Sequence, residues 1–135
     1  MDLDRALAIS ASGMAAQSAR LRVVAENIAN RDSTGQSPGA EPYRRKTVTF
    51  AAQLDRALGA ETVRVARLGR DQRELPQRFE PGHPAADANG YVRTPNVDGL
   101  VENMDMREAN RSYSANLAVL ETTRGMLQRA IEALR

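Results

Sequence analysis

Residues 106–134, MREANRSYSANLAVLETTRGMLQRAIEAL, carry the strongest structural signal in the chain. Large side chains recur in this segment at alternating steps of four and three residues. This spacing is the heptad repeat of a helix that packs one stripe against another helix, so it predicts a long C-terminal helix. The ladder consists of Met106, Asn110, Tyr113, Leu117, Leu120, Arg124, Leu127, Ile131 and Leu134.

A ladder of the same kind lies near the N-terminus and predicts a first helix from about Leu3 to Asn30. The two ladders together predict a mainly α protein, in which two long terminal helices form a coiled-coil-like layer around a small, irregular, β-containing insert. Periodicity leaves open whether the helices pack antiparallel within one chain or on different subunits. The first ladder consists of Leu3, Leu7, Ser10, Met14, Gln17, Leu21, Val24 and Ile28.

The chain therefore divides into residues 1–30, the N-terminal core helix; 31–97, a loop-rich and β-rich insert; and 98–135, the C-terminal core helix. Within the insert, alternation predicts strands over Tyr43–Phe50 and Thr62–Leu68. Residues Phe50–Leu58 resemble a short helix, and Asn89-Gly90 predicts a tight turn. The second helix is expected to begin near Asp98.

Each predicted helix carries a second apolar stripe away from its ladder. A hairpin of two helices needs one seam, so the extra stripes indicate that neighbouring subunits complete the burial; the alternative is that apolar residues simply recur in an Ala-rich helix. The polar ladder residues need polar partners if they are buried, and otherwise lie in solvent. The second stripes contain Ile9, Ala16 and Val23, and Val119, Met126 and Ala133.

Composition narrows the class of protein. The 135 residues include two Phe, three Tyr and no Trp, which is little material for a large core. The net charge of +2 arises from opposing sets of similar size, and no basic stripe with interleaved aromatics indicates nucleic-acid binding. Cysteine is absent, which excludes disulfides and thiolate metal sites. Asp2 and Asp4 stand where a cleavable signal needs basic residues, and no apolar run is long enough to span a membrane.

Candidate catalytic residues do not form a convincing set. His83 lies between Gly82 and Pro84, and no second histidine supports a metal or acid/base site. The carboxylates of Asp98, Glu102 and Asp105 are interpreted as helix N-terminal charges and solvated groups. The sequence thus predicts no catalytic residue, cofactor or metal. The basic run Arg44-Arg45-Lys46 is interpreted as meeting solvent or a neighbouring subunit.

Six motifs in a fixed order carry a family resemblance. Asn27-Ile-Ala-Asn30 alone resembles the wide family of flagellar axial proteins, whereas the loop motifs resemble the proximal rod proteins of the bacterial flagellar basal body. One departure is Asn103, where that family usually has Met. The motifs are Asn27-Ile-Ala-Asn30, Pro42-Tyr-Arg-Arg-Lys46, Pro81-Gly-His-Pro84, Asp87-Ala-Asn-Gly-Tyr-Val92, Pro95-Asn-Val97 and Arg111-Ser-Tyr-Ser-Ala-Asn-Leu117.

The resemblance implies a structural subunit that the flagellar type III apparatus exports without a cleaved signal. Its termini are expected to be poorly ordered in the free subunit and to fold into the inner layer of a torque-transmitting helical rod across the periplasm. The implied partners are the other proximal rod proteins, the distal rod protein and the membrane-embedded base, without nucleic acid or membrane insertion. The alternative is a cytoplasmic helical adaptor; the ordered loop motifs favour the rod.

Two residue sets follow as candidate functional residues. The family-motif residues are Asn27, Asn30, Tyr43, Arg44, Pro81, His83, Asn89, Gly90, Tyr91, Pro95 and Asn96. The predicted assembly interface consists of Leu3, Leu7, Met14, Leu21, Val24, Ile28, Met106, Tyr113, Leu117, Leu120, Leu127, Ile131 and Leu134.

Overall fold

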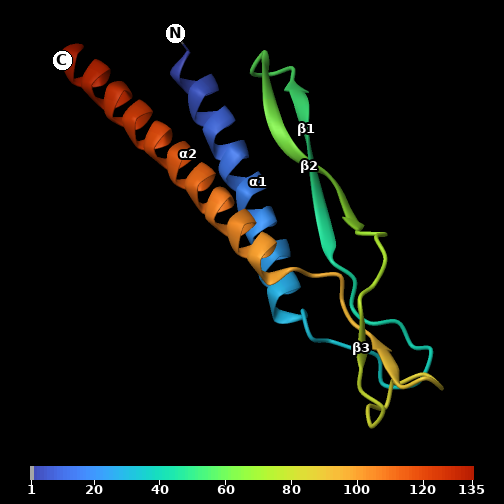
Figure 1. Ribbon diagram of the computed structural model, residues 1–135. Coiled ribbons are helices and arrows are strands. Elements are labelled where there is room, and N and C mark those ends of the chain that lie inside the picture. The colour runs from blue at the N-terminus through green and yellow to red at the C-terminus, as the bar shows by residue number, and fades with distance from the viewer. Residues whose placement is uncertain (1) are drawn as a thin grey trace. The chain divides into compact units, whose positions relative to one another are not determined.

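The computed structural model describes residues 2–135 and contains two long helices and four strands (Figure 1). This confirms the predicted mainly α class with a small β insert. The elements in chain order are α1 (Leu3–Ala29), β1 (Lys46–Asp55), β2 (Ala60–Arg70), β3 (Gln77–Phe79), β4 (Tyr91–Arg93) and α2 (Gly99–Ala133).

The chain forms two compact units, which are described separately. Unit 1 contains residues up to Leu21, Val48–Arg67 and the chain from Arg107 onward. Unit 2 contains Arg22–Thr47 and Leu68–Met106.

Side-chain caps define where both helices begin. The Asp2 carboxylate accepts a hydrogen bond from the Asp4 N–H at 3.1 Å, and the Asp98 carboxylate accepts one from the Leu100 N–H at 2.9 Å. Each cap satisfies a backbone donor that has no partner in the first helical turn. The predicted helix ends are confirmed to within one residue, since α1 ends at Ala29 and α2 starts at Gly99.

Strands β1 and β2 pair in a two-stranded sheet. Residues 56–59 connect them, which is far too short for a parallel crossover, so they form an antiparallel hairpin. Gly59, with φ of 62°, donates its N–H to the Asp55 carbonyl at 2.8 Å. The predicted short helix over Phe50–Leu58 was wrong, because pairing with β2 keeps residues as far as Asp55 extended.

The other predicted strand and turn are confirmed. Thr62–Leu68 lies within β2, while the strand expected from Tyr43 begins at Lys46. Strands β3 and β4 are antiparallel, and the ring centroids of Phe79 and Tyr91 lie 5.3 Å apart. Gly90 adopts a φ of 84° in the preceding turn, where a Cβ would lie 2.9 Å from the Phe79 ring, so glycine is required.

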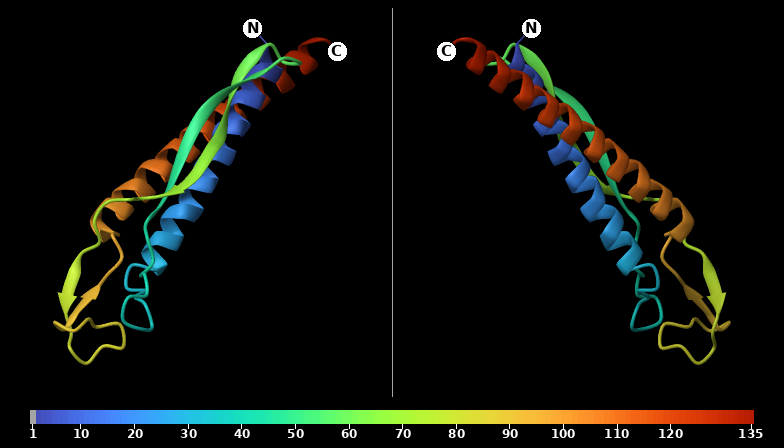
Figure 2. Two further views of the ribbon diagram at one scale, coloured as in Figure 1. Left: turned by 90° about the vertical axis from the view of Figure 1, so that its right-hand side faces the viewer. Right: turned by 90° about the vertical axis from the view of Figure 1, so that its left-hand side faces the viewer.

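In unit 1, α1 and α2 lie side by side and antiparallel (Figures 1 and 2). A Cβ on Gly13 would lie 2.9 Å from the Asn116 amide nitrogen, and Arg20 pairs with Glu108 at 3.4 Å. The most buried side chains here are small: Ser10, Ala16, Ala109 and Thr123.

The hairpin is tied to α1 within unit 1. The Ser12 hydroxyl accepts the Val63 N–H at 3.1 Å and donates to the Ile9 carbonyl at 2.7 Å. No helix between residues 2 and 135 has the length and apolarity needed to cross a lipid bilayer.

Candidate assembly interface

A buried cluster of polar side chains, here called the polar junction, lies in unit 2 and consists of Asn27, Tyr43, Arg45, Asn96 and Glu102. Its centre is the Glu102 carboxylate, which is completely buried. The Arg45 guanidinium forms an ion pair with it. A buried carboxylate is costly unless it is paired and hydrogen-bonded, so this contact is required for the packing of unit 2.

Two further carboxylates approach the same guanidinium. Arg45 lies 3.1 Å from the Asp105 carboxylate and 3.9 Å from that of Asp71. Asp71 also pairs with Arg73 at 2.6 Å. One arginine therefore links the first turns of α2 to the segment that follows β2.

Asn27 connects α1 to the start of β1. Its amide nitrogen donates to the Lys46 carbonyl at 2.9 Å and to the Glu102 carboxylate at 3.3 Å. Its carbonyl oxygen accepts the Lys46 N–H at 2.8 Å and the Tyr43 hydroxyl at 2.7 Å. Both donors and both acceptor positions of the side chain are thus used, which explains why a fully buried site holds an amide.

Asn96 makes a similar bridge between two segments of unit 2. Its carbonyl oxygen accepts the Arg45 N–H at 2.8 Å, and its amide nitrogen donates to the Asp71 carbonyl at 3.0 Å and, more weakly, to the Arg73 carbonyl at 3.4 Å. The neighbouring Arg44 guanidinium donates to the same two carbonyls. These bonds satisfy the backbone of a segment that forms no sheet ladder.

Two groups at the junction have shifted pKa values. Hydrogen bonds from the side chain and the backbone N–H of Arg73 hold the pKa of Asp71 below its ordinary value of 3.8. Burial raises the pKa of Tyr43 above 10.0, although the charge of Lys46 acts in the opposite direction. The junction therefore favours an ionised Asp71 and a neutral Tyr43.

Two interpretations of charged residues need correction. Glu102 lies in the first turn of α2, as its interpretation as a helix N-terminal charge expects, but it is not solvated, because it is buried against Arg45. The basic run at 44–46 was interpreted as meeting solvent or a neighbouring subunit, but Arg45 and Lys46 pair within unit 2, Lys46 with Glu26 at 2.6 Å. Both errors arise because sequence spacing does not reveal that residues 57 positions apart are in contact.

The family-motif residues occupy three places in unit 2. Asn27, Tyr43 and Asn96 belong to the polar junction, Arg44 is hydrogen-bonded beside it, and Pro95 is buried next to Asn96. The Asn30 amide caps the end of α1 by donating to the Glu26 carbonyl at 2.9 Å. The remaining motif residues lie around the β3–β4 ribbon: Pro81, His83, Asn89, Gly90 and Tyr91.

His83 fastens its loop to a second loop. Its Nδ1 accepts the Ala85 N–H at 3.0 Å, so the neutral ring carries its proton on Nε2, which lies 3.1 Å from the Thr34 hydroxyl. Both ring nitrogens are therefore used in contacts within unit 2. These contacts give His83 a structural role, because they hold the two loops together.

The predicted interface residues fall into three classes of exposure. Val24 is 3% exposed, whereas Leu117, Ile131 and Leu134 are 37%, 52% and 88% exposed. The others are half-buried: Leu3, Leu7, Met14, Leu21, Ile28, Met106, Tyr113, Leu120 and Leu127.

In unit 1, the residues of α2 that face α1 differ from those of the predicted ladder at every second position of the ladder. Buried Ala109 and Thr123 and half-buried Asn116 face α1, whereas Asn110 and Arg124 are exposed. Ala109, Asn116 and Thr123 do not belong to the predicted ladder, because the ladder connects the large side chains of the helix. Gly13 was the available signal, since a glycine in a helix permits close approach and close approach requires small partners.

Gln17 also departs from expectation. Its side-chain oxygen is buried without a hydrogen-bond partner within residues 2–135. Such a group normally has a polar partner, so this position weakens the packing of α1 in unit 1.

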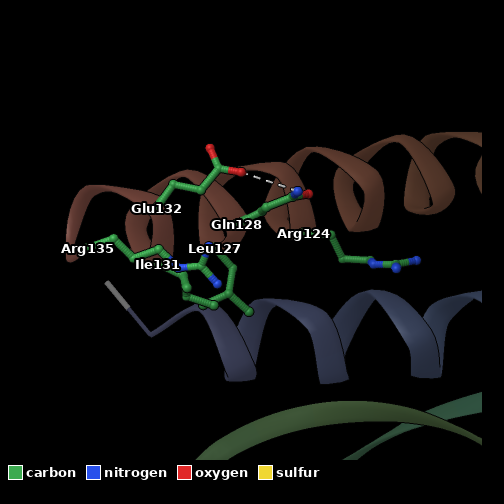
Figure 3. Close-up of a pocket in the computed structure, with 6 residues that line it drawn as sticks. All are labelled: Arg124, Leu127, Gln128, Ile131, Glu132 and Arg135. Carbon is green, nitrogen blue, oxygen red and sulfur yellow. Dashed lines mark hydrogen bonds between the residues drawn. The ribbon is translucent and has the colours of Figure 1, made fainter.

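A cavity of about 420 Å³ lies at the C-terminal end of α2 (Figure 3). Figure 3 shows the Leu127 and Ile131 side chains directed toward the side of α2 where α1 lies. The cavity is lined by Arg124, Leu127, Gln128, Ile131, Glu132 and Arg135.

Within residues 2–135, no group of three His, Cys, Asp or Glu side chains could hold a metal.

Residues 7–35 match the model of the family described as flagella basal body rod protein, and residues 88–133 match that of the flagellar basal body rod FlgEFG protein C-terminal family. The flagellar basal-body rod protein FlgC of Agrobacterium fabrum is 53% identical over 133 residues, which cover 98% of this chain and 96% of the relative. The chain belongs to the FlgC family. FlgC of Salmonella typhimurium is 46% identical over 91% of each chain, and FlgC of Borreliella burgdorferi is 33% identical over 100% and 99%.

The chain is accordingly a structural subunit of the bacterial flagellar basal-body rod. The first matched segment contains most of α1 and the second contains all of α2, and each includes part of the unit 2 loops. The FlgC family assignment thus agrees with the resemblance to rod proteins that was carried by the motifs, several of whose residues meet in the polar junction.

Proposed function

We propose that the chain belongs to the proximal part of the rod and transmits torque through its terminal helices, without catalytic activity. Its partners there are the other proximal rod proteins, with the distal rod protein above and the membrane-embedded base below. Support comes from the similarity to FlgC proteins and from the loop motifs that resemble proximal rod subunits.

One observation carries the helix-mediated assembly. Leu117, Ile131 and Leu134 remain exposed on the helix that faces α1 with small and polar residues. Burying a leucine or isoleucine stabilises an assembly by roughly 1.5–3 kcal/mol per side chain. These exposed ladder residues can therefore stabilise an assembly in which neighbouring subunits bury them.

We also infer that the chain is exported by the flagellar type III apparatus without a cleaved signal, to a rod that spans the periplasm. Ser10 and Ala16 of α1 are buried in unit 1. Removal of a leader that included these residues would destroy that packing. An intact α1 in the assembled protein is expected.

The free subunit is expected to have fewer helical residues than α1 and α2 contain, which are 27 and 35 residues long. The unpartnered oxygen of Gln17 and the exposed ladder both weaken the packing of the helices in the single chain. Circular dichroism of the dilute monomer measures this directly. Two fully formed long helices would contradict the expectation.

The test of assembly uses Leu117→Asp, with Ser114→Asp as the matched control. Both positions are exposed on α2, so neither aspartate should disrupt the single chain, but only the first interrupts the ladder. Leu117→Asp should be exported yet absent from detergent-extracted hook and basal-body particles, whereas Ser114→Asp should be present. Normal incorporation and motility of Leu117→Asp would refute assembly through the ladder.

Leu120→Asp complements this test. Leu120 is half-buried in unit 1, so the charge should impair both folding of that unit and incorporation. Absence of the unaltered chain from purified basal bodies would refute the proposed location itself.

A further inference from the structure

The loop between β3 and β4 contains Asn89-Gly90, and Asn89 is the only asparagine of the chain that glycine follows. The other asparagines precede isoleucine, arginine, valine, methionine or leucine. The peptide nitrogen of the following residue can attack an asparagine side chain, and the attack is easiest at glycine, because no Cβ hinders the approach. Asn89 is also exposed, so its side-chain amide is the most reactive of the asparagine amides in this sequence.

The reaction at this pair is a deamidation. The Gly90 nitrogen gives its proton to hydroxide and forms a bond to the side-chain carbonyl carbon of Asn89. The side-chain nitrogen takes up a proton from water and leaves as ammonia. Water then opens the resulting succinimide at either carbonyl group, which leaves aspartate or isoaspartate at position 89. The reaction consumes only water, so asparagine is a thermolabile residue wherever the backbone permits the attack.

Asp87 holds the backbone on both sides of the reactive bond. Its carboxylate oxygen Oδ1 accepts the N–H of Asn89 and the N–H of Tyr91, each at 2.9 Å. Its main-chain carbonyl accepts the N–H of Gly90 at 3.0 Å. Three successive N–H groups therefore donate to one residue, and the middle group is the nitrogen that must lose its proton in the reaction.

Gly90 is also held by β3 and the residue that follows it. The Gly90 backbone is buried, and its carbonyl accepts the Glu80 N–H at 2.9 Å. A Cβ at this position would lie 2.9 Å from the Phe79 ring, so the ring leaves little space. The attack requires the Gly90 nitrogen to leave Asp87 and approach the Asn89 side chain, and these contacts oppose that movement.

We infer that Asn89-Gly90 is a deamidation site that folding closes, and that Asp87 is the positioning residue that protects it. In the folded chain the reaction proceeds only when the loop opens locally, whereas in the unfolded chain the pair is unprotected. The inference does not depend on the proposed function, because every contact that carries it lies within unit 2.

The isoaspartate product does not fit the loop. It places one additional carbon atom in the main chain before Gly90, beside the Phe79 ring that already leaves no space for a Cβ. A chain that forms isoaspartate before it folds should therefore lose the hydrogen bond from Glu80 to Gly90 and close the β3–β4 ribbon poorly.

The test measures deamidation of the purified full chain at mildly alkaline pH, folded and in urea. Peptide chromatography with mass spectrometry separates the asparagine, aspartate and isoaspartate forms of residue 89. The folded wild type should react at least about tenfold more slowly than the same chain in urea. Asn103, which is exposed and precedes methionine, is the internal control and should remain unmodified in each sample.

Asp87→Ala and Asp87→Asn form a matched pair of variants. Both remove the carboxylate charge, but only asparagine keeps a side-chain oxygen that can accept the N–H groups of Asn89 and Tyr91. Folded Asp87→Ala should deamidate at least about tenfold faster than the folded wild type, and folded Asp87→Asn should stay close to the wild type. In urea, the wild type and both variants should react at one rate.

Equal rates for the folded and unfolded wild type would overturn the inference. A folded Asp87→Ala variant that reacts as slowly as the wild type would also overturn it, as would equal rates for the two variants. Circular dichroism shows whether Asp87→Ala folds. If it does not fold, hydrogen exchange of the wild type decides: protection of the Gly90 amide supports the inference, and exchange at the rate of an unfolded chain overturns it.

Discussion

Replacing Arg45 with methionine should remove the cation that neutralises the most buried carboxylate of the chain. Glu102 is completely buried, and the Arg45 side chain is 19% exposed. Methionine preserves much of the length and apolar stem of arginine but cannot pair with a charge. Glu102 would be left as an uncompensated buried charge, with Asp105 and Asp71 nearby.

The magnitude follows from that arrangement. Removing one partner of a buried ion pair destabilises a protein by about 3–5 kcal/mol, and the partial exposure of Arg45 favours the lower end, about 3 kcal/mol. Replacing Glu102 as well, by methionine, eliminates the stranded charge. The double variant should then lose about 1–2 kcal/mol, because Asn27 no longer donates to Glu102 and Asp105 no longer pairs with Arg45.

Urea unfolding measured by tyrosine fluorescence reports on this region. The chain has no tryptophan, so a background of Tyr91→Phe and Tyr113→Phe leaves Tyr43 as the only emitter. Its hydroxyl lies 2.7 Å from the Asn27 carbonyl oxygen, inside the polar junction. Arg78→Met is the control, since Arg78 is 50% exposed in a surface pair with Glu80 and should cost at most about 1 kcal/mol.

The reasoning fails if Arg45→Met costs no more than Arg78→Met. It also fails if the double variant is less stable than Arg45→Met alone, because the stranded charge of Glu102 would then not be the source of the loss.

Three other perturbations test separate contacts. Tyr43→Phe should lower the free energy of unfolding by about 1 kcal/mol. Because the pKa of Tyr43 is raised in the folded state, the stability of the wild type falls as the pH rises above the unfolded pKa of 10.0, and the variant should show less of this fall. Urea midpoints at pH 8–11 measure the difference. Asp71→Asn should remove the contribution of the ionised Asp71 carboxylate to the free energy of unfolding. This contribution is complete above the unfolded pKa of 3.8 and is lost as the pH falls through the lower folded pKa. An unchanged dependence of stability on pH in acid would contradict this prediction. Gly13→Ala should stabilise unit 1 by about 1 kcal/mol only when Asn116→Ala removes the side chain that a Cβ at residue 13 would contact. Thermal unfolding measures the gain with Asn116 present and with Asn116→Ala. Equal gains with and without Asn116→Ala would refute the close contact.

The helix ends could be predicted from sequence because local chemistry determines them. Asp98 supplies a cap beside Gly99, and the turn formers after Asn30 stop α1. Residues 50–55 could not be assigned in this way, since their composition suits a helix and pairing with β2 decides their conformation.

The candidate site was predictable only in part. The motif residues Asn27, Tyr43 and Asn96 were identified by resemblance. The hydrogen bonds from Tyr43 to Asn27, from Asn27 to Glu102 and from the Arg45 N–H to Asn96 depend on contacts between distant segments, as does the burial of Glu102. The seam was displaced because heptad analysis favours large residues such as Leu117. Close approach at Gly13 instead places the smaller Asn116 opposite α1.

The two-stranded β1–β2 sheet has a consequence for the unassembled chain. Each strand has one partner, so each has an outer edge whose backbone groups could pair with a hairpin of another molecule. Exposed arginines interrupt β2 at Arg64, Arg67 and Arg70, and bringing two such strands together would place like charges in contact. These arginines therefore protect the chain against aggregation during the interval between its synthesis and its incorporation.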